Sequence, residues 1–164
     1  MTTALTARAK VIIGSITAAN MAVAADAAAF CVVVSKRMAK QLGTQGITLL
    51  GGATKGDKPE LPGIAPLAAI NATFTKTSLG ANDITHAEVM EAFAVQAIAC
   101  VQGANLNPAC VNISGGALAR GHPIGASGTI NAVRLYHELL KNGGTGLATI
   151  AAAGGIATAL ILTA

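Results

Sequence analysis

Short apolar runs rich in β-branched residues alternate along this chain with segments of helical periodicity, and this alternation most restricts its fold. Residues 27–35 (AAAFCVVVS) form a continuous apolar run, which is typical of a strand buried on both faces. The segment KRMAKQLG that follows predicts a short helix closed by Gly43 in a left-handed conformation. Such alternation predicts right-handed crossovers and a largely parallel sheet covered by helices on both faces.

The rest of the chain continues this pattern. Further strands are expected near residues 47–50, 88–90 and 111–113, and helices over residues 65–79, 93–101 and 129–140. The last two strands, 147–151 and 157–162, have almost nothing between them and should pair antiparallel. We expect one α/β domain over residues 1–164, with a mixed, mostly parallel five-stranded sheet, a lead-in segment at 1–15 and an exposed loop at 51–63.

The composition narrows the classes of function. The chain is 52% hydrophobic but only 2% aromatic, so few side chains could stack on bases, and we expect no nucleic-acid partner. The formal net charge is +4, and the one basic cluster is Lys36, Arg37 and Lys40. We interpret that cluster as a solvated helix face, with contact to a phosphate as the alternative.

Three cysteines, Cys31, Cys100 and Cys110, show no metal-ligand spacing and no paired framework. Free thiols indicate a reducing compartment, so we expect a cytoplasmic protein that binds no metal, with a mitochondrial location as the alternative. The uncharged segment Gly146–Ala164 could span a bilayer if it were one helix. Because Gly154 and Gly155 interrupt it, we favour two buried strands and no membrane contact.

The stretch GGALARGHPIGASG, residues 115–128, is the strongest candidate for a site. Its glycines allow the backbone to approach a ligand closely and leave amide N–H groups accessible. His122 lies between Gly121 and Pro123 and has little freedom to swing. A histidine held in this way could donate one N–H to a carbonyl oxygen that gains negative charge, as an oxyanion-hole donor.

This stretch resembles the GHP signature of thiolases, enzymes that join or cleave acyl chains on coenzyme A. SITAANMAVAADAAA resembles the family's TVTAGNASG-ND-GAAA segment, EAFA at residues 91–94 resembles the end of NEAFA, and GLATIAAAGGIATALIL resembles the closing GLATLCIGGG-G strand pair. The resemblance runs from Val11 to the C-terminus and matches only the C-terminal half of a thiolase. It implies that His122 serves as the oxyanion donor and helps to activate a nucleophilic cysteine.

Several positions depart from the thiolase pattern. The resemblance places Met90 where the asparagine of NEAFA stands, and Ala151 where a cysteine shuttles the proton. It implies a surface for a coenzyme A thioester formed by Asn20, Ala22, Gly121, Ala153 and Gly154, although Ala22 replaces a serine and Ala153 a glycine. No segment resembles the surroundings of the nucleophilic cysteine. Alanine carries no proton, and methionine offers only a weak acceptor sulfur.

Three hypotheses follow for the function. The first is a thiolase-like C-terminal domain that does not catalyse on its own; the second is an acyltransferase component that works only beside a separate N-terminal half; the third is a small protein anchored in a membrane by its C-terminus. Under the first two we expect a coenzyme A thioester as ligand, no required cofactor, and either a homodimer or an N-terminal half as partner.

Other candidate groups have ordinary structural interpretations. We interpret Cys100 and Cys110 as inert small hydrophobes rather than substitute nucleophiles. His86 and His137 are expected at the surface, and Asp26 is expected to tie loop amides.

Overall fold

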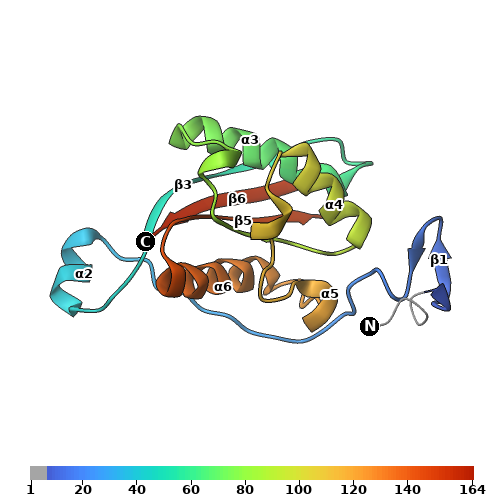
Figure 1. Cartoon of the computed structure of the whole chain (residues 1–164), viewed down its shortest axis with the longest axis horizontal. Coiled ribbons are helices and arrows are strands. Elements are labelled where there is room, and N and C mark those ends of the chain that lie inside the picture. The colour runs from blue at the N-terminus through green and yellow to red at the C-terminus, as the bar shows by residue number, and fades with distance from the viewer. Residues whose placement is uncertain (1–6) are drawn as a thin grey trace.

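The computed structural model describes residues 7–164, and its centre is a four-stranded mixed sheet (Figure 1). The strands are β3 (Thr48–Gly56), β4 (His86–Val89), β5 (Thr145–Ala152) and β6 (Ile156–Thr163), in the order β3-β6-β5-β4. β6 pairs antiparallel with both β3 and β5, whereas β4 runs parallel to β5. The predicted α/β class, the mixed sheet and the C-terminal antiparallel pair are therefore confirmed.

Helices cover both faces of this sheet, as predicted (Figure 1). On one face lie α3 (Pro66–Thr77) and α4 (Ala94–Gly103), and on the other lies α6 (Ser127–Asn142). The larger core is built from small and aliphatic side chains, among them Ala69, Ile70, Val89, Cys100, Leu147 and Ile161. The smaller core joins Leu135 and Leu139 of α6 to Ala148 and Leu162. Small side chains let these layers approach closely, in keeping with the low aromatic content.

The C-terminal β5–β6 hairpin explains why the uncharged segment is not one membrane helix. Its register pairs Ala152 with Ile156, and Gly154 and Gly155 form the turn with φ of +84° and +76°. Glycine takes this left-handed region without the steric cost that other residues meet. The interpretation of residues 146–164 as one helix is wrong, and no helix within residues 7–164 has the length and apolar character needed to cross a bilayer.

Strand β3 is longer than the sequence predicted. Residues 51–56, expected as part of an exposed loop, pair with residues 156–161 of β6. A Cβ at Gly52 would lie 2.8 Å from the carbonyl oxygen of Ala159, so glycine suits this close pairing. The loop prediction is therefore wrong for residues 51–56, because β6 supplies a partner that the local sequence does not reveal. The chain then turns into η1 (Pro62–Ile64).

Two predicted strands are absent. Residues 111–113 form only an isolated bridge between Val111 and Ala87, because Asn112 takes a φ of +49° and turns its side chain into the ladder. The amide of Asn112 accepts from the N–H of Val89 and donates to the carbonyl of Val89, both at 2.9 Å, and so replaces a backbone partner. The sheet thus has four strands rather than five, and one of its three pairings is parallel.

The other absent strand is residues 27–35, which are extended but unpaired and largely exposed. They belong to a chain segment that passes beneath α5 (Ala117–Arg120) and α6, between β1 (Val11–Ile13) at one end of the molecule and α2 (Lys36–Leu42) at the other (Figure 1). No strand within residues 7–164 lies beside this segment to bond its backbone. The prediction of a strand buried on both faces is wrong for this chain, for want of a neighbouring strand.

The remaining short elements complete the chain. Helix α2 is confirmed: the Ser35 hydroxyl accepts from Met38 N, and Gly43 closes the helix with φ of +62°. Within the predicted lead-in, β1 pairs with β2 (Ile16–Thr17), and residues 1–6 lie outside the described part of the chain. Two short turns, η2 (Ala81–Asp83) and η3 (Pro108–Cys110), precede β4 and α5 respectively.

Candidate functional site

The backbone of the glycine-rich loop is fixed between α5 and α6. Gly121 has a φ of +92°, and a Cβ there would lie 2.8 Å from the Cβ of Ala25, so the loop needs glycine at this point. The N–H of His122 donates to the carbonyl of Val23 at 2.7 Å, and Ala24 and His122 form an isolated parallel bridge. Val23 and Ala24, from early in the chain, thereby hold His122 in place.

The imidazole of His122 is fixed by Ser127. Its Nδ1 lies 2.8 Å from the Oγ of Ser127, which is fully buried and bonds the carbonyl of Pro123 at 2.9 Å. A carbonyl oxygen can only accept, so the hydroxyl donates its one hydrogen there and accepts from Nδ1–H. Neutral His122 therefore carries its proton on Nδ1 and leaves a lone pair on Nε2, which has no hydrogen-bond partner among residues 7–164.

The surroundings of His122 favour this neutral form. Burial lowers the pKa of His122 below its ordinary value of 6.5, and the nearby guanidinium of Arg120 lowers it further. The Nη2 of Arg120 donates to the Oδ1 of Asn131 at 2.9 Å, which holds the cation in place. At neutral pH His122 is therefore uncharged, and its free Nε2 can act as a base.

We expect Arg120→Met to raise the pKa of His122 while leaving it below 6.5, because the burial that lowers it remains. NMR titration of the imidazole resonances, with His122→Asn to assign them, measures this change. Since folding lowers this pKa, the contribution of His122 to stability is present above pH 6.5 and is lost as the pH falls through the folded-state value. An unchanged or lower pKa in Arg120→Met would contradict the assigned role of the arginine.

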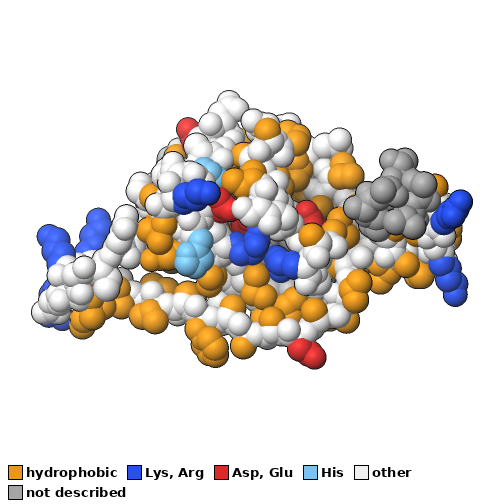
Figure 2. All heavy atoms as spheres, turned by 60° about the horizontal axis from the view of Figure 1, so that its bottom comes forward, with side chains coloured by type: hydrophobic (Ala, Val, Ile, Leu, Met, Phe, Trp, Pro, Cys, Tyr) orange, Lys and Arg blue, Asp and Glu red, His pale blue; other side chains and the backbone are white. Residues whose placement is uncertain are grey.

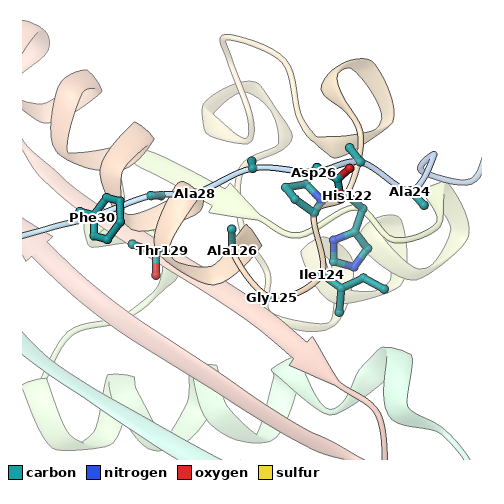
Figure 3. A pocket seen from close by; sticks show the side chains of 13 residues that line it. Ala24, Asp26, Ala28, Phe30, His122, Ile124, Gly125, Ala126 and Thr129 are labelled. Atoms are coloured by element: carbon teal, nitrogen blue, oxygen red, sulfur yellow. The ribbon is translucent and has the colours of Figure 1, made fainter.

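His122 lines an open cavity of about 520 Å³ (Figure 3). One wall is the extended segment from Ala24 to Phe30, and the other is the loop from His122 to Ala126 together with Thr129. Figure 3 shows His122 and Ile124 near one end of the row of lining residues and Phe30 near the other. Apart from His122, Asp26 and Thr129, this lining is apolar or glycine, so the cavity suits a mainly apolar group next to one base.

The same extended segment also holds the loop that follows β4. Ala22 N donates to Ala92 O at 2.9 Å, and Ala94 N donates to Asn20 O at 2.8 Å. Residues 20–24 therefore connect the EAFA loop to the loop of His122 through main-chain bonds. Met90 is buried directly after β4 and its N–H donates to Thr149 O in β5, two residues before Ala151. Met90 and Ala151 do not line the cavity of His122.

Known proteins resemble this chain both in sequence and in fold. The family model described as thiolase, C-terminal domain, matches residues 44–164. A Staphylococcus aureus protein named probable acetyl-CoA acyltransferase is 38% identical over 91% of this chain and 38% of its own length. The structure of the Bacillus anthracis acetyl-CoA acetyltransferase is 34% identical with a TM-score of 0.95, over 99% of this chain and 42% of that one. The chain belongs to the thiolase family.

The chain spans about two fifths of the length of the thiolases it matches. The structure of human mitochondrial 3-ketoacyl-CoA thiolase in complex with CoA matches with a TM-score of 0.91 at 29% identity, over 100% of this chain and 43% of that one. The resemblance to the C-terminal part of a thiolase is thereby confirmed in sequence and in fold.

The other residues assigned from the thiolase resemblance lie at separate places. The side chain of Asn20 accepts from Thr17 N and donates to Ser15 O, so its amide is engaged within its own turn. Ala153 and Gly154 lie in the exposed turn between β5 and β6, outside the cavity of His122. Asp26 lines the cavity and makes no hydrogen bond within residues 7–164, so its predicted role of tying loop amides is wrong.

The two buried cysteines of this thiolase chain are not activated. Burial raises the pKa of both the Cys100 and the Cys110 thiol, and each donates to a nearby carbonyl, Gly63 O and Asn107 O respectively. A reactive thiol needs the opposite shift. All three cysteines are free, and no metal-binding group of histidine, cysteine and carboxylate side chains occurs in the part of the chain that is described.

Sequence reasoning missed the groups that support the glycine-rich loop. Glu91 accepts from the N–H of Leu118 at 3.0 Å and from the side-chain amide of Asn112 at 2.6 Å. A Cβ on Gly116 would lie 2.1 Å from the Glu91 carboxylate, so the second glycine of the loop makes room for it. In the sequence, Glu91, Arg120 and Ser127 stand within otherwise apolar motifs. Polar side chains in such surroundings indicate buried hydrogen bonds.

Proposed function

We propose that this chain supplies the histidine-bearing half of a thiolase-type site for a coenzyme A thioester, and that its 164 residues do not transfer acyl groups by themselves. The observation that carries the proposal is the state of His122: neutral, held through Nδ1 by Ser127, and with Nε2 unoccupied beside an open cavity. An apolar wall next to one base suits an acyl thioester. No other cofactor is proposed.

The chemistry available to His122 is proton transfer through Nε2. With the proton on Nδ1, Nε2 can accept a proton from a thiol brought to the cavity, which turns the thiol into a nucleophilic thiolate. The imidazolium formed then presents an N–H at Nε2 and can donate to a carbonyl oxygen that gains negative charge. The oxyanion-donor role predicted from sequence therefore depends, in this proposal, on a prior proton transfer to His122.

Two kinds of observation, on the buried thiols and on the replaced polar side chains, argue against turnover by this chain alone. Burial raises the pKa of both buried thiols, and neither Cys100 nor Cys110 lines the cavity of His122. Met90 and Ala151 cannot hold or move a proton. General acid–base groups contribute on the order of 10²- to 10⁴-fold to a rate, so an N-terminal half that supplies only the nucleophile should give slow turnover.

The second candidate is an acyltransferase component that becomes fully active beside an N-terminal thiolase half. The intact geometry of His122 favours it, since a catalytic base has been retained in a competent state. This candidate predicts ordinary turnover once the other half is present. The first predicts very little until the replaced side chains are restored.

We expect the purified chain to show no thiolysis of acetoacetyl-CoA, and only slow thiolysis when co-expressed with the N-terminal part of the Staphylococcus aureus relative. Met90→Asn combined with Ala151→Cys should raise turnover of that pair about 100-fold or more, because it returns an amide and a thiol to the vacant positions. His122→Asn in the restored pair is the matched control and should abolish the gain. Turnover by the unmodified chain alone would overturn the proposal, and full turnover by the unmodified pair would favour the second candidate.

A further inference from the structure

Arg120, at the end of α5, is a partly buried cation with incomplete hydrogen bonding. Its Nε is buried and has no hydrogen-bond partner, the only such side-chain nitrogen or oxygen among residues 7–164. The neighbouring cation on α6, Arg134, is bonded through Nε to the Glu88 carboxylate at 3.0 Å and through Nη2 to Gly115 O at 2.6 Å. A buried donor without an acceptor loses its bond to water and gains none, so this atom of Arg120 lowers the stability of the fold.

The charge of Arg120 also lacks a carboxylate partner. The one ion pair within residues 7–164 joins Arg134 to Glu88, and the Oε1 of Glu91 accepts from Asn112. Figure 2 shows Lys and Arg side chains gathered near the centre of the face over α5 and α6, with acidic side chains beside them. Burial and the repulsion of Arg134 outweigh the attraction of both carboxylates and lower the pKa of Arg120 below 12.5. The folded protein therefore holds this charge less favourably than the unfolded chain does.

One side chain, Asn131 of α6, holds the guanidinium of Arg120 in place. The Nη2 of Arg120 donates to the Oδ1 of Asn131 at 2.9 Å, and Asn131 is only 1% exposed. The Nδ2 of Asn131 donates to Thr149 O in β5 at 3.2 Å, a carbonyl that also accepts from Met90 N. These two bonds satisfy both ends of the buried amide. Asn131 thereby fixes the cation to the central sheet.

The group that this arrangement affects is His122. Only Gly121, with its φ of +92°, separates Arg120 from His122 in the chain. Burial lowers the pKa of His122, and Arg120 is the one charge that lowers it further. Asp26, the carboxylate on the opposite wall of the cavity, makes no hydrogen bond to the imidazole, whose Nδ1 is bonded to Ser127. The neighbour on which Arg120 has an effect of chemical use is therefore His122.

We propose that Arg120 is a positioning residue for the base His122, kept at a cost to the stability of the fold, and that Asn131 holds its guanidinium beside the glycine-rich loop. The positive charge disfavours the imidazolium, so Nε2 stays free in mildly acid as well as neutral solution. The same charge makes the imidazolium, once formed, return its proton more readily. The proposal rests on the proposed function for the use of this base, but not for the arrangement that tunes it.

The first test is the stability of four proteins: the wild-type chain, Arg120→Met, Asn131→Leu and the double variant. Methionine keeps the apolar stem of the arginine, and leucine is close to asparagine in volume. In the double variant neither buried polar group remains, and Thr149 O keeps its bond from Met90 N, so the urea midpoint should equal or exceed that of the wild type. Each single variant leaves one partner unpaired and should be less stable than the double variant. An arginine with a purely structural role predicts the opposite order, with the double variant below the wild type.

The second test measures the base directly. Diethyl pyrocarbonate acylates a neutral imidazole, and mass spectrometry follows its addition to His122, with His122→Asn to identify the modified peptide. In mildly acid buffer the rate at His122 should fall about threefold or more in Arg120→Met and in the double variant, because more of the imidazole is protonated. Arg120→Lys keeps a cation, is the matched control, and should stay within about twofold of the wild type. His86 and His137 serve as internal references and should react at unchanged rates.

Three outcomes would each overturn the proposal: a double variant less stable than the wild type, an unchanged rate at His122 in Arg120→Met, or an equal fall in Arg120→Lys. None of these measurements uses a thioester or a partner chain. The expected results in a chain whose pair stays inactive after Met90→Asn with Ala151→Cys would therefore leave the role of Arg120 intact and count against the proposed acyl-CoA site.

Discussion

Arg134→Met is expected to destabilise the domain by about 3 kcal/mol or more, the cost of leaving a buried charge without its partner. The Nε of Arg134 lies 3.0 Å from the Oε2 of Glu88, and the glutamate side chain is only 3% exposed. The same guanidinium donates from Nη2 to the carbonyl of Gly115 at 2.6 Å, so its loss also releases the start of the glycine-rich loop. Methionine retains the apolar stem and isolates the loss of the charge.

Urea denaturation of the variant, with Glu88→Met/Arg134→Met as the matched control, measures this cost. The double variant should recover most of the stability, because no buried charge remains. A loss below about 1 kcal/mol in Arg134→Met, the range of an exposed pair, would show that the pair does not stabilise the fold.

The pH dependence of this loss has a defined sign. Burial raises the pKa of Glu88 above 4.5 and outweighs the lowering by its hydrogen bond to Arg134. A raised carboxyl pKa contributes stability that is present below 4.5 and is lost as the pH rises through the folded-state value. Without Arg134 the pKa of Glu88 rises further, so the cost of Arg134→Met should be larger at neutral pH than in acid.

Gly155→Ala is expected to destabilise the β5–β6 hairpin more than Gly154→Ala. Both glycines have positive φ, +76° and +84°, and alanine there costs about 1–2 kcal/mol. Only at Gly155 does the added Cβ meet backbone, 2.7 Å from Asp57 O and 2.8 Å from Lys58 O, whereas nothing lies within 4 Å at Gly154. The crowding should add about 1–3 kcal/mol in Gly155→Ala.

The midpoints of urea denaturation for the two variants measure this difference directly. Gly154→Ala serves as the control for backbone conformation alone. Equal losses would show that the strand-to-loop contact at Asp57 and Lys58 yields freely, and that the close approach seen at Gly155 does not constrain the fold.

The elements predicted well from sequence find their partners inside this chain. Helices α3 and α6 bury their apolar faces against opposite faces of the sheet that contains the β5–β6 hairpin, so periodicity alone indicated them. The prediction failed at residues 27–35 because no strand within residues 7–164 borders them, and at residues 111–113 because a side-chain amide of Asn112 replaces a backbone partner. Neither cause is visible in a local window of sequence.

Part of the candidate site could likewise be predicted from sequence and part could not. His122 stood out because a rigid loop surrounds it, and the structure places it beside a cavity. The proton assignment came from Ser127, five residues along, and the lowered pKa from burial and Arg120. The position of the proton on His122 and the lowered pKa both depend on how the loop turns back on itself at the start of α6. Spacing in the sequence names the residues of such a network but not its direction of hydrogen donation.

The main-chain bonds of residues 20–24 have a consequence for how this sequence changes over time. This stretch joins two loops through the N–H of Ala22, the carbonyl of Asn20 and the carbonyl of Val23, backbone groups that every residue type except proline supplies at position 22 and that all residue types supply at positions 20 and 23. Substitutions there can exchange one side chain for another without altering the scaffold's dimensions. The geometry of the two loops can therefore persist where the side chains of residues 20–24 differ from the thiolase motif.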